Sequence, residues 1–324
     1  MGTRRGLVFI ALLFCSALQG SGSAGGAEKG SNYPFSPSMY PSNTQMVAKR
    51  SWTDMAYATV SNAEKLDLYL PSTTFAGPYP LVVYIHGGAF KAGDKAKPYN
   101  NGLVAQLLSN GYAVASVNYR LSGEATFPAA VRDVKAAVRW LRAKAALYNL
   151  DKSNFAAWGD SAGANLASML GTSCGVSNLE GPSLGNSGES SCVQAVVDWF
   201  GPTDFLQMDA ESVANSCTPF HDQPDSPESE YLGVPIQQHP ALAAEANPIT
   251  YVTSSDPPFF IQQGTLDCTV PYQQSQLFYD ALKPVIGDAN VTLMLLNGWV
   301  HEDAQFTATS NVDLVLAFLD KWLK

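Results

Sequence analysis

Residues 154–167 constrain this chain more than any other stretch. A short apolar run, typical of a buried strand, meets the sequence GDSAG at 159–163, and small residues at helical spacing follow. In this strand–turn–helix context, Gly-x-Ser-x-Gly forms a tight turn that exposes the serine hydroxyl. Gly159 and Gly163 lack the Cβ that would clash with the neighbouring strand and helix. Ser161 is therefore the candidate nucleophile, at a helix start whose unpaired N–H groups favour negative charge.

Strands and helices alternate along most of the chain. Residues 66–70 alternate apolar and polar side chains, which predicts an early antiparallel strand. Helices are expected for about twenty residues from Pro128, after the GDSAG turn, around 272–282 and at the C-terminus. A continuously apolar run at 81–85 predicts a parallel strand covered on both faces, and further core strands are expected at 113–117, 193–200, 259–261 and 291–296. The pattern predicts an α/β fold, one mostly parallel central sheet with helices on both faces.

The first 49 residues are expected to lie outside this fold. Two arginines precede an apolar run at 7–18, and small residues follow, which is typical of a secretory signal peptide over residues 1–24. The apolar run is too short to span a membrane. Residues 25–49 are rich in Gly, Ser and Pro and are expected to form a flexible linker or arm. We therefore expect a secreted or periplasmic protein without a membrane anchor once the signal is removed.

The catalytic domain is expected to cover residues 50–324. Within it, the pattern of strands and helices breaks down over residues 201–256, where prolines and acids are frequent. A segment this long without clear elements is usually functional, and we expect it to form a cap that shapes the substrate site.

The charge balance excludes one class of partner. The full chain has a net charge of −9, and residues 1–24 contain two arginines and no acids, so the processed chain carries −11. An acidic chain without basic clusters is not expected to bind nucleic acid.

Four cysteines remain after removal of the predicted signal: Cys174, Cys192, Cys217 and Cys268. An even number in an exported chain indicates two disulfides, with three possible pairings. Cys174 follows the helix after the GDSAG turn and Cys192 precedes the next strand, which favours the pairs Cys174–Cys192 and Cys217–Cys268. Four buried free thiols are the alternative. A zinc site is disfavoured, because the chain has no Cys-x-x-Cys and no His at ligand spacing, and neither metal nor cofactor is expected.

A serine needs a base within hydrogen-bonding reach to become a nucleophile. The chain has four histidines. His86 begins a glycine-rich turn, whereas His221 and His239 lie in the Pro-rich segment and are interpreted as polar surface residues. His301 lies in a loop after the last predicted strand, and loops at that edge of a parallel sheet converge on the active site. We therefore predict His301 as the base.

The acid that orients the base is expected between Ser161 and His301. Asp267 follows a predicted strand and lies 301 − 267 = 34 residues before the histidine. Asp198, inside a strand, and Asp204 are competitors, and a solvated loop carboxylate is the alternative interpretation of Asp267. The acid would hold the imidazole tautomer and stabilise the imidazolium.

Acyl transfer also needs N–H donors for a developing oxyanion. The backbone N–H of Ala162, directly after the serine, is one candidate. The sequence HGGAF at 86–90 offers others, because small residues let its backbone approach a substrate oxygen. A phosphate-binding glycine loop is excluded, since neither Gly-x-x-x-x-Gly-Lys nor a three-glycine dinucleotide fingerprint is present.

Together these residues resemble an α/β-hydrolase of the hormone-sensitive-lipase-like group, most similar to carboxylesterases related to bifunctional feruloyl and acetyl-xylan esterases. The matching stretches are HGGAF (86–90), VNYRLS (117–122), FPAAVRDVKAAVRWL (127–141), WGDSAG (158–163), VDWFGPTD (197–204), DPPFFIQQGTLDCTVP (256–271) and the final Gly-x-x-His ending at 301. The resemblance implies that Gly88 and Ala89 form an oxyanion hole with Ala162, and that His86 is structural. Ala89 stands where lipase-like members often have Gly, but its N–H is retained.

The expected function is a carboxylic-ester hydrolase that works through an acyl-enzyme on Ser161. The resemblance implies short-chain, acetyl or aromatic feruloyl-type esters, as small molecules or linked to a polymer. An amide hydrolase, either an arylformamidase or a peptidase, is the alternative, because related folds use the same residues on amides. A non-catalytic binding module is disfavoured, since all three triad members are present.

Overall fold

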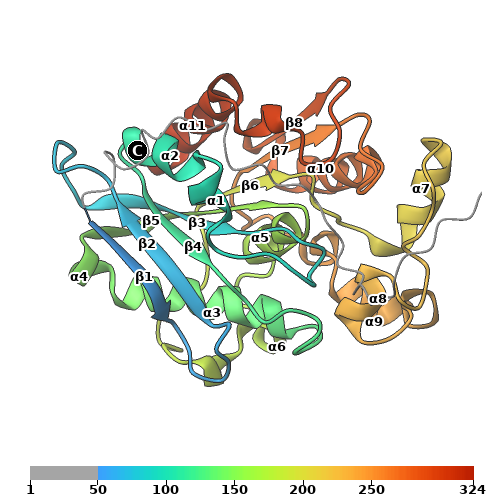
Figure 1. The fold of residues 1–324 in the computed structure, drawn as a ribbon, viewed down its shortest axis with the longest axis horizontal. Helices are drawn as coiled ribbons and strands as arrows, with labels where there is room; N and C mark the ends of the chain where they lie inside the picture. The colour runs from blue at the N-terminus through green and yellow to red at the C-terminus, as the bar shows by residue number, and fades with distance from the viewer. Residues whose placement is uncertain (1–49) are drawn as a thin grey trace, which may run out of the picture. The chain divides into compact units, whose positions relative to one another are not determined.

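The computed structural model describes residues 50–324, so the predicted signal peptide (1–24) and linker (25–49) lie outside the described residues. An eight-stranded sheet has the order β1-β2-β4-β3-β5-β6-β7-β8 (Figure 1). The strands are β1 (Arg50–Ala56), β2 (Lys65–Leu70), β3 (Tyr79–Ile85), β4 (Ala113–Val117), β5 (Leu150–Asp160), β6 (Ala195–Trp199), β7 (Phe259–Gly264) and β8 (Val291–Leu296).

Strand direction follows the prediction. β2 pairs antiparallel with β1 and β4, and the five pairings from β4 to β8 are all parallel. This arrangement confirms the mostly parallel α/β-hydrolase sheet and the early antiparallel strand. β1 was not predicted, because its side chains are mostly exposed and show no apolar alternation.

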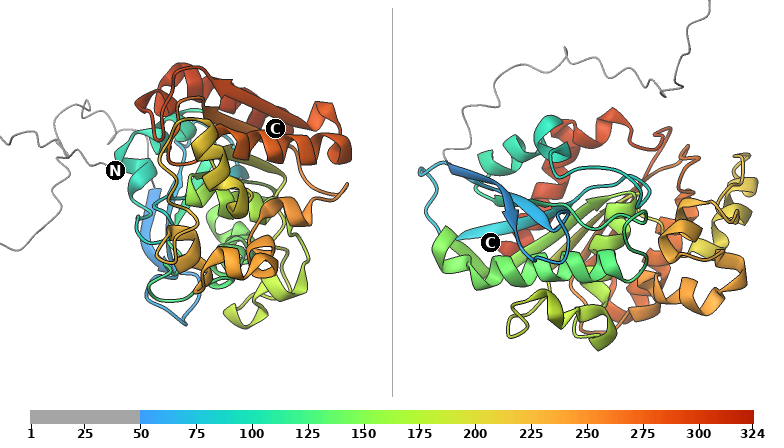
Figure 2. Two further views of the ribbon diagram at one scale, coloured as in Figure 1. Left: turned by 90° about the vertical axis from the view of Figure 1, so that its right-hand side faces the viewer. Right: turned by 60° about the horizontal axis from the view of Figure 1, so that its bottom comes forward.

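Two layers of helices cover the sheet (Figure 2). Apolar side chains of α2 (Leu103–Ser109) and α11 (Thr309–Leu323) pack with Val82 and Tyr84 on one face. The opposite face packs Leu81 and Val83 against α3 (Ala129–Ala143), α5 (Ala162–Thr172) and α10 (Tyr272–Ile286). Successive strand residues therefore enter different cores, which explains why β3 is apolar at consecutive positions.

The predicted helix after Pro128 is interrupted. α3 begins directly after Pro128 as expected, but Lys144 leaves helical geometry and a separate turn, α4 (Ala145–Tyr148), follows. Asn149 then adopts φ 56°, the left-handed conformation that ends a helix. Outside residues 201–256, the remaining helices and turns are α1 (Lys97–Asn100), α6 (Ser177–Glu180), η2 (Pro182–Leu184), η6 (Asp288–Asn290) and η7 (Ala304–Thr307).

Residues 201–256 form short helices rather than a long irregular loop. They comprise η3 (Phe205–Gln207), α7 (Met208–Ala214), α8 (Pro227–Leu232), η4 (Ile236–Gln238), α9 (Pro240–Glu245) and η5 (Pro248–Tyr251). α7, α8 and α9 lie together at one side of the domain formed by residues 50–324 (Figure 1). The Gln274 side chain of α10 accepts from the N–H groups of Thr203 and Asp204 at 2.8 and 2.7 Å, which anchors the start of the segment.

Both disulfides have the favoured pairing, and the free-thiol alternative is wrong. Cys174–Cys192 closes the loop after α5, with 5.1 Å between the Cα atoms. Cys217–Cys268 joins the 201–256 segment to the loop after β7, with 5.4 Å between the Cα atoms. Two such bonds indicate folding in an oxidising environment. Over residues 50–324, none of the helices combines the length and apolarity needed to cross a membrane.

Asp198 is a buried residue of β6 whose carboxylate faces α5. It accepts hydrogen bonds from the Ser168 hydroxyl at 2.6 Å and the Gly201 N–H at 2.9 Å. Burial raises the pKa of Asp198 to about 6, although both hydrogen bonds oppose the shift. In the folded protein the Asp198 carboxyl group therefore keeps its proton at pH values where the unfolded chain has released it.

This raised pKa predicts a loss of stability with increasing pH. The contribution of Asp198 is fully present below about pH 4 and is lost as pH rises through about 6, a change of about 3 kcal/mol. The variant Asp198→Asn keeps an oxygen for the Gly201 N–H and removes the titration. Urea unfolding between pH 4 and 7 should show wild type losing about that much free energy of unfolding relative to the variant. Exposed Asp313→Asn serves as the control; equal pH profiles for wild type and Asp198→Asn would contradict the assignment.

Candidate active site

Ser161 lies on a tight turn between β5 and α5. Its backbone has φ 53° and ψ −124°, a conformation that non-glycine residues rarely adopt. A Cβ on Gly159 would lie 2.1 Å from the Gly163 carbonyl oxygen, and one on Gly163 would lie 2.1 Å from the Ile85 carbonyl oxygen. The Ser161 N–H donates to the Trp199 carbonyl at 2.8 Å. Only glycine fits both flanking positions, as the sequence pattern predicts.

His301 lies beside this serine. Its Nε2 is 3.1 Å from Ser161 Oγ, and its Nδ1 is 2.7 Å from Asp267 Oδ2. The carboxylate can only accept, so Nδ1 carries the proton and Nε2 is free to accept from the serine hydroxyl. The Phe200 ring packs edge-on against the imidazole at 4.8 Å between ring centroids. The three residues chosen from the sequence thus form one hydrogen-bonded line.

Asp267 is buried and fully hydrogen-bonded. Its Oδ1 accepts from the N–H groups of Thr269 and Val270 at 2.8 and 2.9 Å. Its Oδ2 accepts from Gln263 Nε2 at 2.9 Å in addition to His301. Four donors stabilise the ionised carboxylate away from water. The interpretation of Asp267 as a solvated loop carboxylate is therefore wrong.

The two competing acids face other groups. Asp198 bonds Ser168 and Gly201, as described above. Asp204 accepts from the Leu206 N–H at 3.2 Å and from the Asn247 side chain at 3.2 Å. Neither carboxylate contacts His301.

The HGGAF turn carries two unpaired N–H groups, and its Ala89 lines the same pocket as the serine. Gly88 has φ 122° and Ala89 has φ 56°, so the chain turns sharply at these residues. Within residues 50–324, the N–H groups of Gly88, Ala89 and Ala162 donate to no protein acceptor. Ala89, Ser161 and Ala162 line one pocket of about 30 Å³. Such donors can stabilise negative charge on an oxygen next to the serine.

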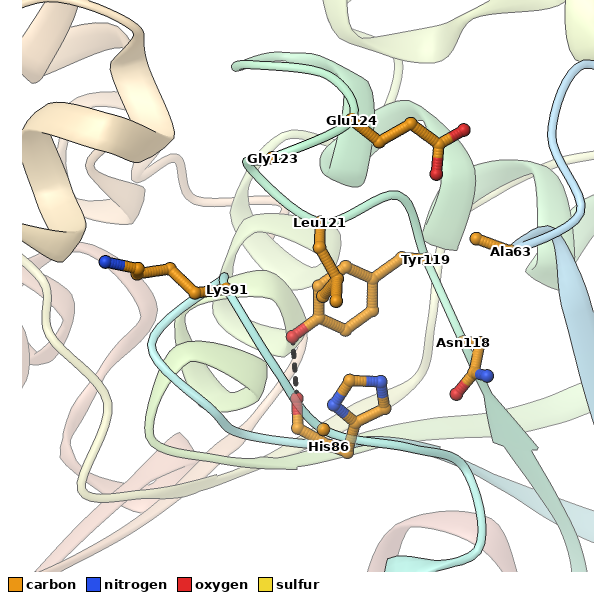
Figure 3. Close-up of a pocket in the computed structure, with 9 residues that line it drawn as sticks. Ala63, His86, Lys91, Asn118, Tyr119, Leu121, Gly123 and Glu124 are labelled. Carbon is orange, nitrogen blue, oxygen red and sulfur yellow. Dashed lines mark hydrogen bonds between the residues drawn. The ribbon is translucent and has the colours of Figure 1, made fainter. Parts of the chain in front are cut away.

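His86 lies behind this turn. Its Nδ1 is 2.8 Å from the Gly87 carbonyl oxygen, and its ring stacks on Tyr119 at 4.6 Å between centroids. Burial lowers the pKa of His86, which keeps the imidazole neutral. Both rings line a separate pocket of about 310 Å³, and the Tyr119 hydroxyl donates to the His86 carbonyl at 2.9 Å (Figure 3). These contacts support the structural role that the resemblance implies.

The interpretation of His221 as a surface residue is wrong. His239 is exposed as expected, but His221 is 1% exposed and its Nδ1 lies 3.1 Å from Glu228 Oε1. His221 lines the Ser161 pocket together with Phe220 and Pro227. Composition alone could not place it, because the disulfide at Cys217 and the short helices fold this Pro-rich stretch onto the site.

Asp160, the residue before the serine, connects two other parts of the site, although the sequence pattern did not identify it. Its Oδ1 accepts from the Gly87 N–H at 3.1 Å, and its Oδ2 accepts from Lys97 Nζ at 2.6 Å. The same ammonium lies 2.5 Å from Glu302 Oε1, next to the histidine. Burial alone would lower the pKa of Lys97, but the carboxylates of Asp160 and Glu302 outweigh it and raise that pKa. The signal that could have identified Asp160 is its acidic side chain inside a GxSxG turn, because a carboxylate buried there needs hydrogen-bond partners.

A serine hydroxyl, an imidazole and a buried carboxylate in line, beside free N–H donors, can support nucleophilic acyl transfer. Across the described residues 50–324, His, Cys, Asp and Glu side chains form no cluster that could hold a metal ion.

Comparison with known proteins places these residues in a family. The BD-FAE family matches residues 66–282. Among curated proteins of Mycobacterium tuberculosis (strain ATCC 25618 / H37Rv), Esterase LipQ is 31% identical over 232 residues, 71% of this chain and 52% of that protein. Esterase LipC is 27% identical over 223 residues, 69% of this chain and 53% of that protein. The chain thus spans about half the length of these curated relatives.

Solved structures share the fold. A truncated carbohydrate esterase from gut microbiota has a TM-score of 0.76 and 32% identity, covering 85% of this chain and 96% of that one. A bifunctional GH43-CE protein of Bacteroides eggerthii has a TM-score of 0.75 and 34% identity, covering 84% of this chain and 35% of that one. An esterase from Thermogutta terrifontis, at 22% identity and a TM-score of 0.66, covers 87% of this chain and 95% of that one and is similar in fold alone.

Proposed function

The chain belongs to the BD-FAE family, and from that premise we propose that it is a serine carboxylesterase whose triad is Ser161, His301 and Asp267. The observation that carries this proposal is the hydrogen-bonded line from Ser161 Oγ through His301 to Asp267, on the turn whose glycines admit no side chain. The curated relatives are named esterases and the similar structure from gut microbiota is a carbohydrate esterase, which supports ester chemistry.

In the first half-reaction, Ser161 Oγ attacks the ester carbonyl carbon while His301 Nε2 takes the hydroxyl proton. Asp267 holds the imidazole in the required tautomer and stabilises the imidazolium that forms. The carbonyl oxygen becomes an oxyanion, which the N–H groups of Gly88, Ala89 and Ala162 stabilise. The C–O bond then breaks, His301 gives its proton to the departing alcohol, and the acyl group remains on Ser161.

In the second half-reaction, water replaces the alcohol. His301 takes a proton from the water as its oxygen attacks the acyl carbon, and the same donors stabilise the second oxyanion. The bond to Ser161 Oγ breaks, the serine recovers its proton from His301, and the carboxylic acid leaves. Asp160, through Gly87 and Lys97, holds the donor turn and the histidine loop in place during both steps.

The shape of the pocket supports a small acyl group. A volume of about 30 Å³, with Phe90, Phe220 and Val270 in its lining, favours an acetyl or other short chain. Aromatic feruloyl-type esters are the second class that the resemblance implies, and polymer-linked as well as small-molecule esters fit this chemistry. Residues 201–256 would then act as the cap, because Phe220, His221 and Glu228 line the same pocket.

Export is also part of the proposal. A signal peptide over residues 1–24, followed by a linker over 25–49, would deliver residues 50–324 to a secreted or periplasmic location. The two disulfides support this route, since such bonds persist in oxidising compartments.

Loss of the nucleophile tests the triad. Ser161→Ala should lower kcat/KM for p-nitrophenyl acetate by about 10³-fold or more without altering the fold, because no other group occupies the nucleophile position. His301→Ala should cause a similar loss, whereas the exposed His239→Ala should retain wild-type turnover. Near-normal turnover by purified, folded Ser161→Ala would end the assignment.

A panel of p-nitrophenyl esters of different acyl length, together with p-nitroacetanilide, tests the substrate class. The small pocket predicts faster hydrolysis of p-nitrophenyl acetate and butyrate than of the palmitate ester, and faster hydrolysis of p-nitrophenyl acetate than of p-nitroacetanilide. Initial rates at matched substrate concentrations provide the comparison. Faster palmitate hydrolysis would contradict the short-chain assignment, and faster anilide hydrolysis would favour an amide hydrolase.

A further inference from the structure

His221 and Glu228 form a buried pair inside the Ser161 pocket. His221 is 1% exposed and Glu228 is 4% exposed, and both line the pocket with Ser161. Nδ1 of the imidazole lies 3.1 Å from one carboxylate oxygen. The other two polar atoms, His221 Nε2 and Glu228 Oε2, have no hydrogen-bond partner in the described part of the chain. The pocket of the predicted nucleophile is thus lined by two residues that each carry an unpartnered polar atom.

The surrounding contacts hold this pair in position. The Asp209 carboxylate accepts from the His221 N–H at 2.7 Å and from the Asp222 N–H at 3.1 Å. The Phe220 ring lies against the imidazole with 4.0 Å between centroids. The Cys217–Cys268 disulfide joins the same stretch to the loop that carries Asp267. The pair therefore has a defined geometry that does not depend on a free surface loop.

Leaving these atoms unpaired is costly. A buried polar atom without a partner costs about 1–3 kcal/mol, more when it is charged, so the two atoms call for a partner that the chain itself does not supply. The pocket keeps this polar pair although the rest of its lining includes the apolar residues Phe90, Phe220 and Val270. A polar pair of this kind is typical of a site where a bound substrate supplies the missing hydrogen-bond partner.

We propose that His221 and Glu228 hydrogen-bond a hydroxyl group of the substrate that lies a few bonds from the ester carbonyl. This inference rests on the proposed esterase function and adds the residues that select the substrate. When Nδ1–H donates to Glu228, Nε2 and the second carboxylate oxygen are both acceptors, so either one can accept the single O–H of a hydroxyl group. A neutral hydroxyl also loses less hydration free energy than an ammonium group on entering a pocket with aromatic walls. The small pocket places the hydroxyl near the reacting carbonyl.

The hydroxyl can belong to the acyl or to the alcohol part of the ester, and matched substrates distinguish the two. Methyl 3-hydroxybutyrate and methyl butyrate test the acyl part. Glycerol 1-monoacetate and propyl acetate test the alcohol part. Acid release at constant pH measures kcat/KM for all four esters in the same assay.

Wild type should prefer the hydroxylated ester in one of the two pairs by at least about tenfold, the equivalent of one hydrogen bond. His221→Phe, which keeps an aromatic ring next to Phe220, and Glu228→Gln, which keeps shape without charge, should each reduce that ratio by about tenfold. His239→Phe and Glu245→Gln place the same changes at exposed positions of the 201–256 segment and should keep the wild-type ratio.

Three results would overturn the inference. Wild type could show no hydroxyl preference in either pair, or both variants could lose activity equally on hydroxylated and deoxy esters, which would make the pair structural. Faster hydrolysis of methyl 3-aminobutyrate than of the 3-hydroxy ester would assign the pair to an ammonium group instead. Hydrolysis of methyl butyrate or propyl acetate that depends on Ser161 keeps the esterase proposal intact in each case. Absence of ester hydrolysis by wild type would reject the esterase proposal itself.

Discussion

The contact between the Ser161 turn and the end of β3 is the constraint on which the site depends. Gly163 lies so close to the Ile85 carbonyl that a methyl group would reach 2.1 Å from its oxygen. That approach brings the start of α5, with its free Ala162 N–H, beside the HGGAF turn that follows β3. Ser161 and the unpaired N–H groups of the HGGAF turn are therefore positioned by one backbone contact, which the parallel pairing of β3 and β5 maintains.

Ion pairs attach the loop that carries His301 and Glu302 to the Ser161 turn. Asp160 accepts from the Gly87 N–H, and its second oxygen binds Lys97, whose ammonium also binds Glu302. The Asp160 carboxylate is nearly inaccessible, so its pairing with an ammonium is screened less than a surface ion pair. The histidine loop, the donor turn and the serine turn thus share one network of hydrogen bonds, which resists their separation.

The sequence predicted residues whose role follows from their immediate neighbours in the chain or from their order along it. Gly159 and Gly163 identified the turn, and the position of His301 after the last strand identified the histidine now found beside Ser161. Asp267 followed from chain order, and the disulfide pairs followed from the elements that flank them. The fold of the sheet was predictable because buried parallel strands are predominantly apolar on both faces.

What the sequence did not predict depends on packing between distant segments. His221 looked like a surface residue, since a Pro-rich, acidic stretch gives no periodic signal, yet a disulfide and short helices bury it at the site. Asp160 looked like a variable position in a motif, because its partners Gly87 and Lys97 lie more than 60 residues away. β1 has few buried side chains and forms only by pairing along β2.

Covalent labelling of the nucleophile tests the central claim most directly. A fluorophosphonate ester transfers its phosphonyl group to an activated serine, and intact-mass spectrometry followed by peptide mapping locates the adduct. One adduct per chain is expected, on Ser161, and labelling should be slowed strongly in His301→Ala because the base is missing. An adduct on another residue, or no adduct on folded wild-type protein that hydrolyses p-nitrophenyl acetate, would contradict the claim.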